Sequence, residues 1–108
     1  MNEKDELPAL DENGHLLHIT DWSPLVAKKL AQRDGIVLDD RHWQLIEFVR
    51  QYYDDFGIAP GMRLLVASLR KRLGAGKANS RYLYQLLPDS PARQLACYAG
   101  FAKPVSCI

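Results

Sequence analysis

The chain has 108 residues, of which 47% are hydrophobic and 25% charged, with two cysteines and a formal net charge of +1. This length suits one modest domain, the composition argues against intrinsic disorder, and no apolar run reaches the roughly 18 residues that a membrane span needs. Residues 1–60 carry 6 Lys and Arg against 12 Asp and Glu, whereas residues 61–108 carry 8 against 1. The second half is therefore expected either to face an acidic partner or to neutralise the first half within the fold.

The N-terminal region begins MNEKDELPAL, which carries acidic side chains and lacks an apolar segment. We therefore expect no signal peptide and a cytoplasmic location, where thiols are kept reduced. Further along, Asn13-Gly14 lies between two short runs of β character. Asn-Gly is typical of a type I′ turn, because both central positions of that turn need a positive φ. The pattern predicts a short N-terminal β-hairpin over about residues 8–19.

The segment DWSPLVAKKLAQRDG predicts the first helix. Ser23 is a typical N-cap, Pro24 suits the first helical position, and Gly35 suits the stop. The residues expected to face inward are Leu25, Val26 and Leu30.

The segment LDDRHWQLIEFVRQYYDDFG predicts the longest helix, capped by Asp39 or Asp40 and ended by Gly57. A stripe of seven apolar residues runs along it, and it is broader than a surface helix needs. We therefore place this helix at the centre of the core. The stripe consists of Trp43, Leu45, Ile46, Phe48, Val49, Tyr53 and Phe56.

Three further helices are predicted in the segments APGMRLLVASLRKRLG, NSRYLYQLLP and SPARQLACYAG. The second is capped by Asn79 or Ser80 and stops near Pro88, and the third starts at Ser90-Pro91 and stops at Gly100. Beyond Gly100 the sequence has no helical periodicity, and Pro104 prevents the last helix from continuing. The predicted fold is mainly α: one domain of about five helices over residues 1–100, with a mobile arm over 101–108 that carries Cys107.

Several kinds of site find little support. LGAGKANS lacks the spacing of a phosphate-binding loop, and the three histidines at 15, 18 and 42 lie far from both cysteines in sequence. Residues 61–108 contain no His and only Asp89 as an acid, which argues against a hydrolytic triad there. No metal and no cofactor are expected.

The basic segments MRLLVASLRKRLG and NSRYLY follow each other like the two helices of a helix-turn-helix, so a DNA-binding regulator is one rival interpretation. The connector GAGKA is longer than the turn of that motif, and basic residues opposite an apolar stripe are also typical of any solvated helix. We expect direct contact with nucleic acid to be absent and the basic residues to dock acidic partner surfaces. These residues are Arg63, Arg70, Lys71, Lys77, Arg81, Arg93 and Lys103.

The two cysteines differ in setting. Cys97 is expected in the last turn of the final helix, where the negative end of the helix dipole disfavours a thiolate, so it is either a sluggish thiol or a small buried residue. Cys107 lies in the arm, which extends about 23 Å from Gly100 at 3.3 Å per residue. The arm is long enough to enter a partner's cleft or to fold back to Cys97. We interpret the pair as a travelling thiol and a resolving thiol.

The runs HWQLIEFVRQYYDDFGIAPGMRLL and NSRYLYQLLPDSPARQLACYAGFAKPVSCI resemble the family of sulfur-relay proteins that includes DsrC, the gamma subunit of dissimilatory sulfite reductase, and TusE. The resemblance extends from about Asp21 to Ile108. It is carried by His42-Trp43, Ala59-Pro60, Arg63, Asn79-Ser80, Tyr82-Leu83-Tyr84, Pro91-Ala92, Ala99-Gly100, Lys103-Pro104 and Cys107.

This resemblance implies a small, winged-helix-like helical fold with a short N-terminal hairpin and a mobile C-terminal arm. It also implies that Cys107 carries sulfane sulfur as a persulfide. DsrC-type members have a second cysteine ten residues earlier, where this chain has Cys97. The resemblance thus favours a DsrC-type carrier in dissimilatory sulfur metabolism, with sulfur held on Cys107 or bridged to Cys97 as a trisulfide. Val105-Ser106 stand where DsrC-type arms usually have Thr-Gly.

The implied partners are a siroheme sulfite reductase of the DsrAB type, DsrEFH-type and TusA-type sulfur donors, and a membrane-bound complex that reduces or oxidises the trisulfide. The alternative is a TusE-type relay, which passes sulfur from a TusBCD-type complex to the enzyme that 2-thiolates the tRNA wobble uridine. In both cases the chain acts as a stoichiometric persulfide carrier rather than as an autonomous enzyme. A third interpretation is a purely structural subunit of a reductase.

Overall fold

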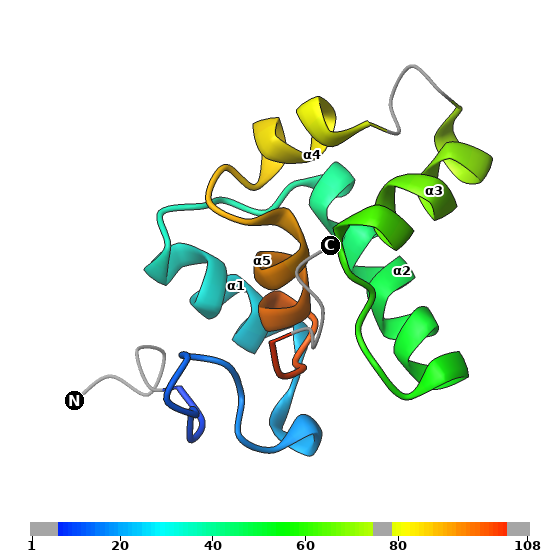
Figure 1. Ribbon diagram of the computed structural model, residues 1–108. Coiled ribbons are helices and arrows are strands. Elements are labelled where there is room, and N and C mark those ends of the chain that lie inside the picture. Colours follow the sequence, from blue (N-terminus) through cyan, green and yellow to red (C-terminus); the bar gives the residue numbers. More distant parts are fainter. Residues whose placement is uncertain (1–6, 75–78, 104–108) are drawn as a thin grey trace.

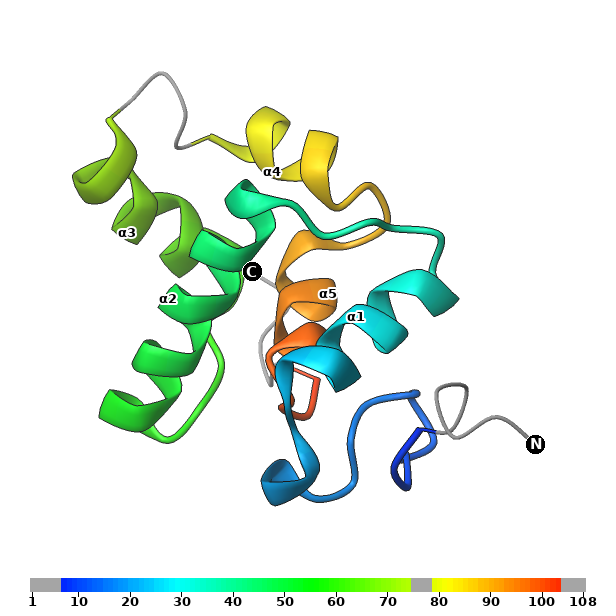
Figure 2. The same ribbon diagram turned by 180° about the vertical axis from the view of Figure 1, so that it is seen from behind.

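The computed structural model describes residues 7–74 and 79–103, which form five α-helices and one short 3-10 helix without any strand. Figures 1 and 2 show the helices from two sides. In chain order the elements are η2 (Ile19–Asp21), α1 (Pro24–Arg33), α2 (Asp40–Phe56), α3 (Met62–Leu73), α4 (Ser80–Leu86) and α5 (Pro91–Tyr98). No described helix is both long enough and apolar enough to cross a bilayer.

The N-terminal hairpin predicted over residues 8–19 was wrong as a pair of strands. The chain does turn at the predicted place, with Gly14 at a φ of +81°, but a single antiparallel bridge joins Leu10 to Leu16. The Asp11 carboxylate accepts the backbone N–H groups of Asn13 and His15, which closes the turn on a side chain. Because η2 begins soon afterwards, no ladder can form, and the described residues contain no β wing of the expected winged-helix type.

Helix α5 lies at the centre of the fold, and the other four α-helices all pack against it (Figures 1 and 2). Every one of its eight residues is buried except Arg93. The prediction that the longest helix is central was therefore wrong. Helix α2 buries one face on α5, whereas Phe56 at its end is 65% exposed. The small residues Ala92 and Ala96 suit α5 to this place, because they let neighbouring helices approach closely.

Capping contacts confirm the predicted starts of α1 and α4, whereas Ser90 makes no side-chain cap at the start of α5. Ser23 Oγ accepts the N–H of Val26 at the start of α1, and Asn79 Oδ1 accepts the N–H of Tyr82 at the start of α4. Helix α1 buries Leu30 as predicted, but Leu25 is 56% exposed, so its inward assignment was wrong. The buried face of α1 is narrower than predicted and consists of Ala27, Leu30 and Ala31.

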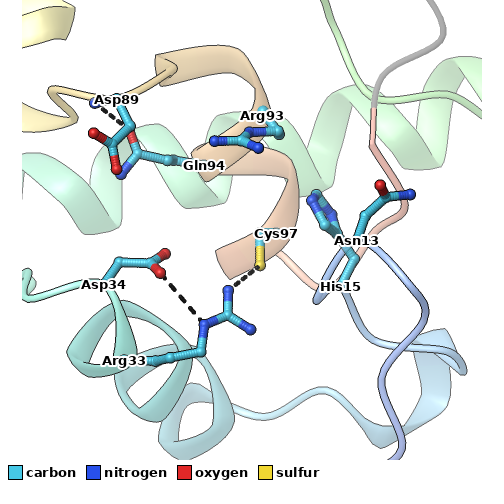
Figure 3. Close-up of a pocket in the computed structure, with 8 residues that line it drawn as sticks. All are labelled: Asn13, His15, Arg33, Asp34, Asp89, Arg93, Gln94 and Cys97. Carbon is cyan, nitrogen blue, oxygen red and sulfur yellow. Dashed lines mark hydrogen bonds and ion pairs between the residues drawn. The ribbon is translucent and has the colours of Figure 1, made fainter.

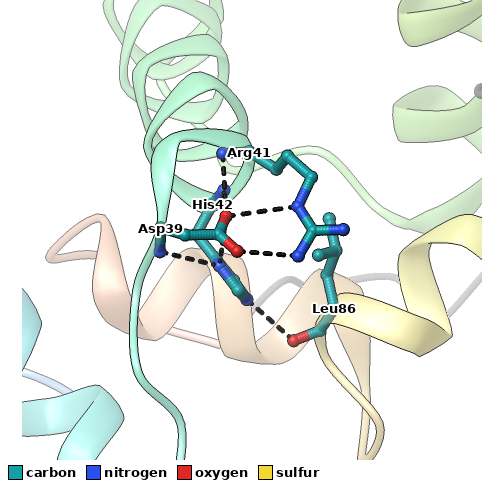
Figure 4. A network of polar contacts seen from close by, with 4 residues as sticks. All are labelled: Asp39, Arg41, His42 and Leu86. Carbon is teal, nitrogen blue, oxygen red and sulfur yellow. Dashed lines mark hydrogen bonds and ion pairs between the residues drawn. The ribbon is translucent and has the colours of Figure 1, made fainter.

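The start of α2 is tied to the end of α4 through His42 (Figure 4). Asp39 caps the helix, and its backbone N–H donates to His42 Nδ1 at 3.1 Å. The other ring nitrogen, Nε2, donates to the carbonyl oxygen of Leu86 at 2.9 Å. Arg41 holds the Asp39 carboxylate through a 2.7 Å ion pair. One buried imidazole thus joins two helices that are far apart in sequence.

Candidate functional site

Cys97 lies in the last turn of α5, as predicted, and its side chain is buried with 3% exposure. The thiol donates to the carbonyl oxygen of Gly14 over 3.6 Å and accepts from Arg33 Nη2 over 3.7 Å. It borders a polar pocket of about 170 Å³ built from the N-terminal turn, the end of α1 and the start of α5 (Figure 3). The lining residues are Asn13, His15, Arg33, Asp34, Asp89, Arg93, Gln94 and Cys97.

The surroundings of Cys97 keep it in the thiol form. Burial raises the pKa of the Cys97 thiol, and the positive charge of Arg33 opposes this shift without cancelling it. The carboxylates of Asp34 and Asp11 act in the same direction as burial. Because the thiolate is the nucleophile, Cys97 is a weak one in this conformation.

A series of hydrogen bonds through Tyr98 and Gln94 connects the residues that line this pocket. The Tyr98 hydroxyl donates to Asp34 Oδ2 at 2.7 Å and lies 3.4 Å from Gln94 Nε2. Gln94 Oε1 in turn accepts the backbone N–H groups of Asp89 and Ser90, just before α5 begins. Burial and the hydrogen bond to Asp34 raise the pKa of the Tyr98 phenol. The pocket walls are therefore fixed to α1 and to both ends of α5.

The last residue of α5 and the segment that follows it are held by three side chains from other parts of the chain. The indole Nε1 of Trp22 donates to the carbonyl oxygen of Tyr98 at 2.7 Å, and Arg50 Nη1 donates to that of Ala99 at 2.5 Å. His15 Nδ1 donates to the carbonyl oxygen of Phe101 at 2.8 Å. The carbonyl oxygens at the end of α5 and just after it are thus satisfied by these side chains together with the backbone N–H groups of residues 99–101.

Aromatic packing fixes the same segment, residues 98–101, which we call the arm root. The Phe101 ring stacks on Tyr53 of α2 with centroids 3.9 Å apart and planes 7° apart. The guanidinium of Arg50 lies 3.8 Å from the centre of the Trp22 ring and 5.5 Å from that of Phe101. None of these contacts is marked in the sequence, since each joins residues at least 28 positions apart.

Cys107 and the rest of the predicted arm beyond Lys103 lie outside the described residues, and so does Lys77. The proposed pairing of Cys107 with Cys97 therefore stays a prediction. The other six predicted docking residues are all exposed: three on α3, one each on α4 and α5, and one after α5. In that order they are Arg63, Arg70, Lys71, Arg81, Arg93 and Lys103.

No group of three or more His, Cys, Asp and Glu side chains in the described parts of the chain is arranged to hold a metal ion. His15 and His42 are both buried, and each uses a ring nitrogen to donate a hydrogen bond to a backbone carbonyl oxygen of a distant segment. Their role in this structure is to connect elements.

The family model described as "DsrC like protein" matches residues 2–108. A curated relative, "Sulfurtransferase TusE" of Sodalis glossinidius, is 44% identical over 98 residues, which cover 91% of each chain. The solution structure of Allochromatium vinosum DsrC is 43% identical with a TM-score of 0.83, covering 92% of this chain and 88% of that one.

The crystal structure of the oxidised gamma subunit of dissimilatory sulfite reductase from Archaeoglobus fulgidus is 34% identical with a TM-score of 0.82, covering 94% of this chain and 92% of that one. These two solved structures bear the DsrC name, whereas the curated relatives from Sodalis glossinidius and Yersinia pseudotuberculosis bear the TusE name. Those curated names fit the TusE alternative better than the dissimilatory assignment that the cysteine spacing favoured.

Proposed function

Because this chain belongs to the DsrC-like family, we propose that it is a sulfur-relay protein that carries sulfane sulfur on Cys107, in the manner of its TusE relatives. The observation that carries the proposal is the 44% identity to a sulfurtransferase over nine-tenths of both chains. The matched fold, with TM-scores above 0.8 to two DsrC structures, supports the same family role.

The proposed chemistry is two successive thiol exchanges. The Cys107 thiolate attacks the terminal sulfur of a donor persulfide, the donor's S–S bond breaks, and the donor leaves as a thiolate. The thiolate of an acceptor then attacks the outer sulfur of the Cys107 persulfide, and Cys107 leaves as a thiolate. One sulfane sulfur moves and no external oxidant or reductant is consumed.

The state of Cys97 supports a TusE-type relay. A trisulfide between Cys97 and Cys107 requires the Cys97 thiol to ionise and to meet the arm, yet this thiol is buried, and burial raises its pKa. A relay through Cys107 alone requires neither. We therefore propose that sulfur passes to a tRNA-thiolating enzyme from a donor complex of the TusBCD type, as the family resemblance implies for TusE-type members.

The dissimilatory role remains the second candidate because Cys97 occupies the position of the second DsrC-type cysteine and because the structural relatives are DsrC proteins. In that role the partners are a siroheme sulfite reductase, DsrEFH-type or TusA-type donors and a membrane-bound redox complex. The internal trisulfide is the step that separates the two candidates, since only the DsrC-type cycle needs it.

Intact-mass measurement of the reduced chain after exposure to a small persulfide donor tests the carrier chemistry. We expect one added sulfur on the wild type and on Cys97→Ala, and none on Cys107→Ala. Equal loading of Cys107→Ala would contradict the proposal. An internal bridge that needs both thiols would favour the DsrC-type cycle.

Complementation separates the two candidates in cells. In a bacterium that lacks its own TusE, we expect the chain and Cys97→Ala to restore 2-thiouridine in tRNA, whereas Cys107→Ala does not. Restoration that depends on Cys97, or no restoration by any form, would count against the TusE-type role.

A further inference from the structure

An apolar pocket of about 250 Å³ opens beside the arm root. It is formed where three parts of the chain meet: residues 16–19, the end of α2 with the loop that follows it, and residues 102–103. Among the residues that line it, Lys103 is the only charged one. We call it the arm-root pocket. It shares no lining residue with the pocket beside Cys97.

Large hydrophobic side chains surround this pocket and remain open to water. Leu17 is 55% exposed, Ile19 is 43% exposed and Ile58 is 52% exposed. These are three of the eight large hydrophobic residues that are exposed in the described part of the chain. Scattered exposed hydrophobic residues need no explanation, but a cluster around a hollow is typical of a binding site.

The walls of the pocket are preformed. Tyr53, on the α2 side, is stacked against Phe101 of the arm root, and Leu16 is buried with 3% exposure. Gly57 ends α2 with a φ of +76°, and this residue turns the chain so that Ile58 faces the opening. A ligand that enters here does not have to order the pocket first, which keeps the cost of binding low.

The position of the pocket connects it with sulfur transfer, and this step rests on the proposed function. Lys103 lines the pocket, and Cys107 follows it by four residues. Four residues span at most about 14 Å. The Cα atom of Cys107 can therefore lie at most about 14 Å from that of Lys103, so a protein that exchanges sulfur with Cys107 must bring its reactive thiol close to this opening.

We propose that the arm-root pocket is the docking site for the proteins that exchange sulfur with Cys107, and that it receives a nonpolar side chain of the partner with a carboxylate beside it. The apolar lining selects the nonpolar group, and the lone cation Lys103 at the rim selects the carboxylate. Helix α4 and the end of α3, which carry several of the predicted basic docking residues, lie at the opposite end of the molecule from residues 16–19 (Figure 1). A partner seated on that basic end alone would lie far from the arm root.

Peptide selection tests the chemistry of this site without knowledge of the partner. A phage-displayed library of random peptides is selected on the immobilised full chain, and the enriched peptides are synthesised with a fluorescent label. We expect leucine, isoleucine or phenylalanine next to aspartate or glutamate. Affinity, measured by fluorescence anisotropy, should fall about tenfold or more in Ile58→Asp and in Leu17→Asp, because a charge then faces the apolar lining.

Leu25→Asp is the matched control, since Leu25 is 56% exposed on α1 and does not line the pocket. It should bind the peptides like the wild type. Peptides without the expected pattern, failure to enrich any peptide, or equal binding to Ile58→Asp would overturn the proposal. So would a concentration-dependent dimer that Ile58→Asp abolishes, or tighter peptide binding in Val105→Asp, since these would identify a second copy or the chain's own arm as the occupant.

Sulfur loading of the same variants tests the proposed carrier role of Cys107 independently of the proposed docking role of the arm-root pocket. A small persulfide donor needs no docking, so Ile58→Asp should still gain one sulfur on Cys107. If no form of the chain gains sulfur, the proposed function fails while the peptide result still decides the docking site. If loading is normal and the peptides ignore the pocket, the docking proposal alone fails.

Discussion

The guanidinium of Arg50 lies 3.8 Å from the centre of the Trp22 ring and donates a hydrogen bond to the carbonyl oxygen of Ala99. One side chain of α2 thus holds both the backbone that leaves α5 and the indole that covers it. Trp22 contributes its own hydrogen bond to the carbonyl oxygen of Tyr98. The arm root is therefore fixed by polar and aromatic contacts together.

We call the contacts of Arg50 with Trp22 and with the carbonyl oxygen of Ala99 the arm-root clamp. Removal of this clamp should destabilise the fold without changing Cys107 itself. Arg50→Met loses a charge-assisted hydrogen bond and a cation–π contact, and we expect the free energy of unfolding to fall by about 2 kcal/mol. Urea unfolding followed by circular dichroism measures this as a lower midpoint at unchanged slope. Lys28→Met, at an exposed position of α1, should leave the midpoint nearly unchanged. A midpoint for Arg50→Met equal to that of Lys28→Met would contradict the clamp.

Gly100 cannot accept a side chain. Its φ is +94°, and a Cβ there would lie 2.6 Å from Trp22 Cδ1. Backbone strain and this clash together should lower the free energy of unfolding of Gly100→Ala by about 3 kcal/mol. Gly35→Ala provides the comparison, because Gly35 has a φ of +80° but nothing within 4 Å of the added Cβ, so only the backbone strain of about 1 kcal/mol applies. Thermal unfolding of the two variants should show the larger loss at Gly100, and equal losses would exclude the clash.

The Cys97 thiol should make the fold sensitive to alkaline pH. Its pKa is raised in the folded state, mainly by burial, so the folded chain keeps the thiol protonated while the unfolded chain ionises it. This contribution is complete below the ordinary thiol pKa of about 8.5 and is lost as the pH rises through the folded value. In the Cys107→Ala background, urea midpoints should fall more steeply above pH 8.5 than those of the chain that also carries Cys97→Ala. If the urea midpoints of the two variants fell in parallel with pH, this would contradict a raised pKa of the buried Cys97 thiol.

Alkylation gives an independent measure of the same environment. In Cys107→Ala, iodoacetamide should modify Cys97 much more slowly than it modifies the urea-unfolded chain at the same pH, because the thiol is both buried and protonated. The same slow reaction is expected in Arg33→Met, which removes the cation that opposes the rise in the Cys97 pKa and also removes the hydrogen bond from Arg33 to the sulfur. Mass spectrometry of timed samples should show rapid modification only after unfolding. Rapid modification of the folded chain would show that Cys97 is accessible.

At acid pH, protonation of the Asp39 carboxylate should lower the free energy of unfolding. The ion pair with Arg41 lowers the pKa of the Asp39 carboxyl, and the N–H groups at the start of α2 act in the same direction. The stabilisation is present above the ordinary value of about 3.9 and is lost as the pH falls through the folded value. Asp39→Asn keeps a capping oxygen but has no charge to lose, so its stability should fall less between pH 4 and pH 2. Identical acid profiles for Asp39→Asn and the wild type would contradict the assignment.

The helix boundaries could be predicted because their causes are local. Ser23 and Asn79 as N-caps, Pro24 and Pro91 at first helical positions, and Gly57 at a helix end act within a few residues of themselves. The family could be recognised for a similar reason, since its motifs are short runs at fixed spacing.

The central position of α5 and the clamp on the arm root could not be predicted, because they depend on contacts between distant residues. Nothing near Arg50 in the sequence points to Trp22 or Ala99. The hairpin prediction placed the turn correctly, but backbone pairing across it stops after the bridge between Leu10 and Leu16, because η2 begins at Ile19. The exposed Leu25 shows that an apolar residue at helical spacing can still lie outside the contact face.

The central place of α5 has a consequence for the order in which the chain opens. A helix that touches all other helices loses its protection against hydrogen exchange only when the whole fold opens. The arm root continues from this helix and is hydrogen-bonded to residues of the N-terminal segment and α2. We therefore expect α5 to exchange most slowly, and a partner that pulls on the arm to act first on this central helix rather than on a peripheral one.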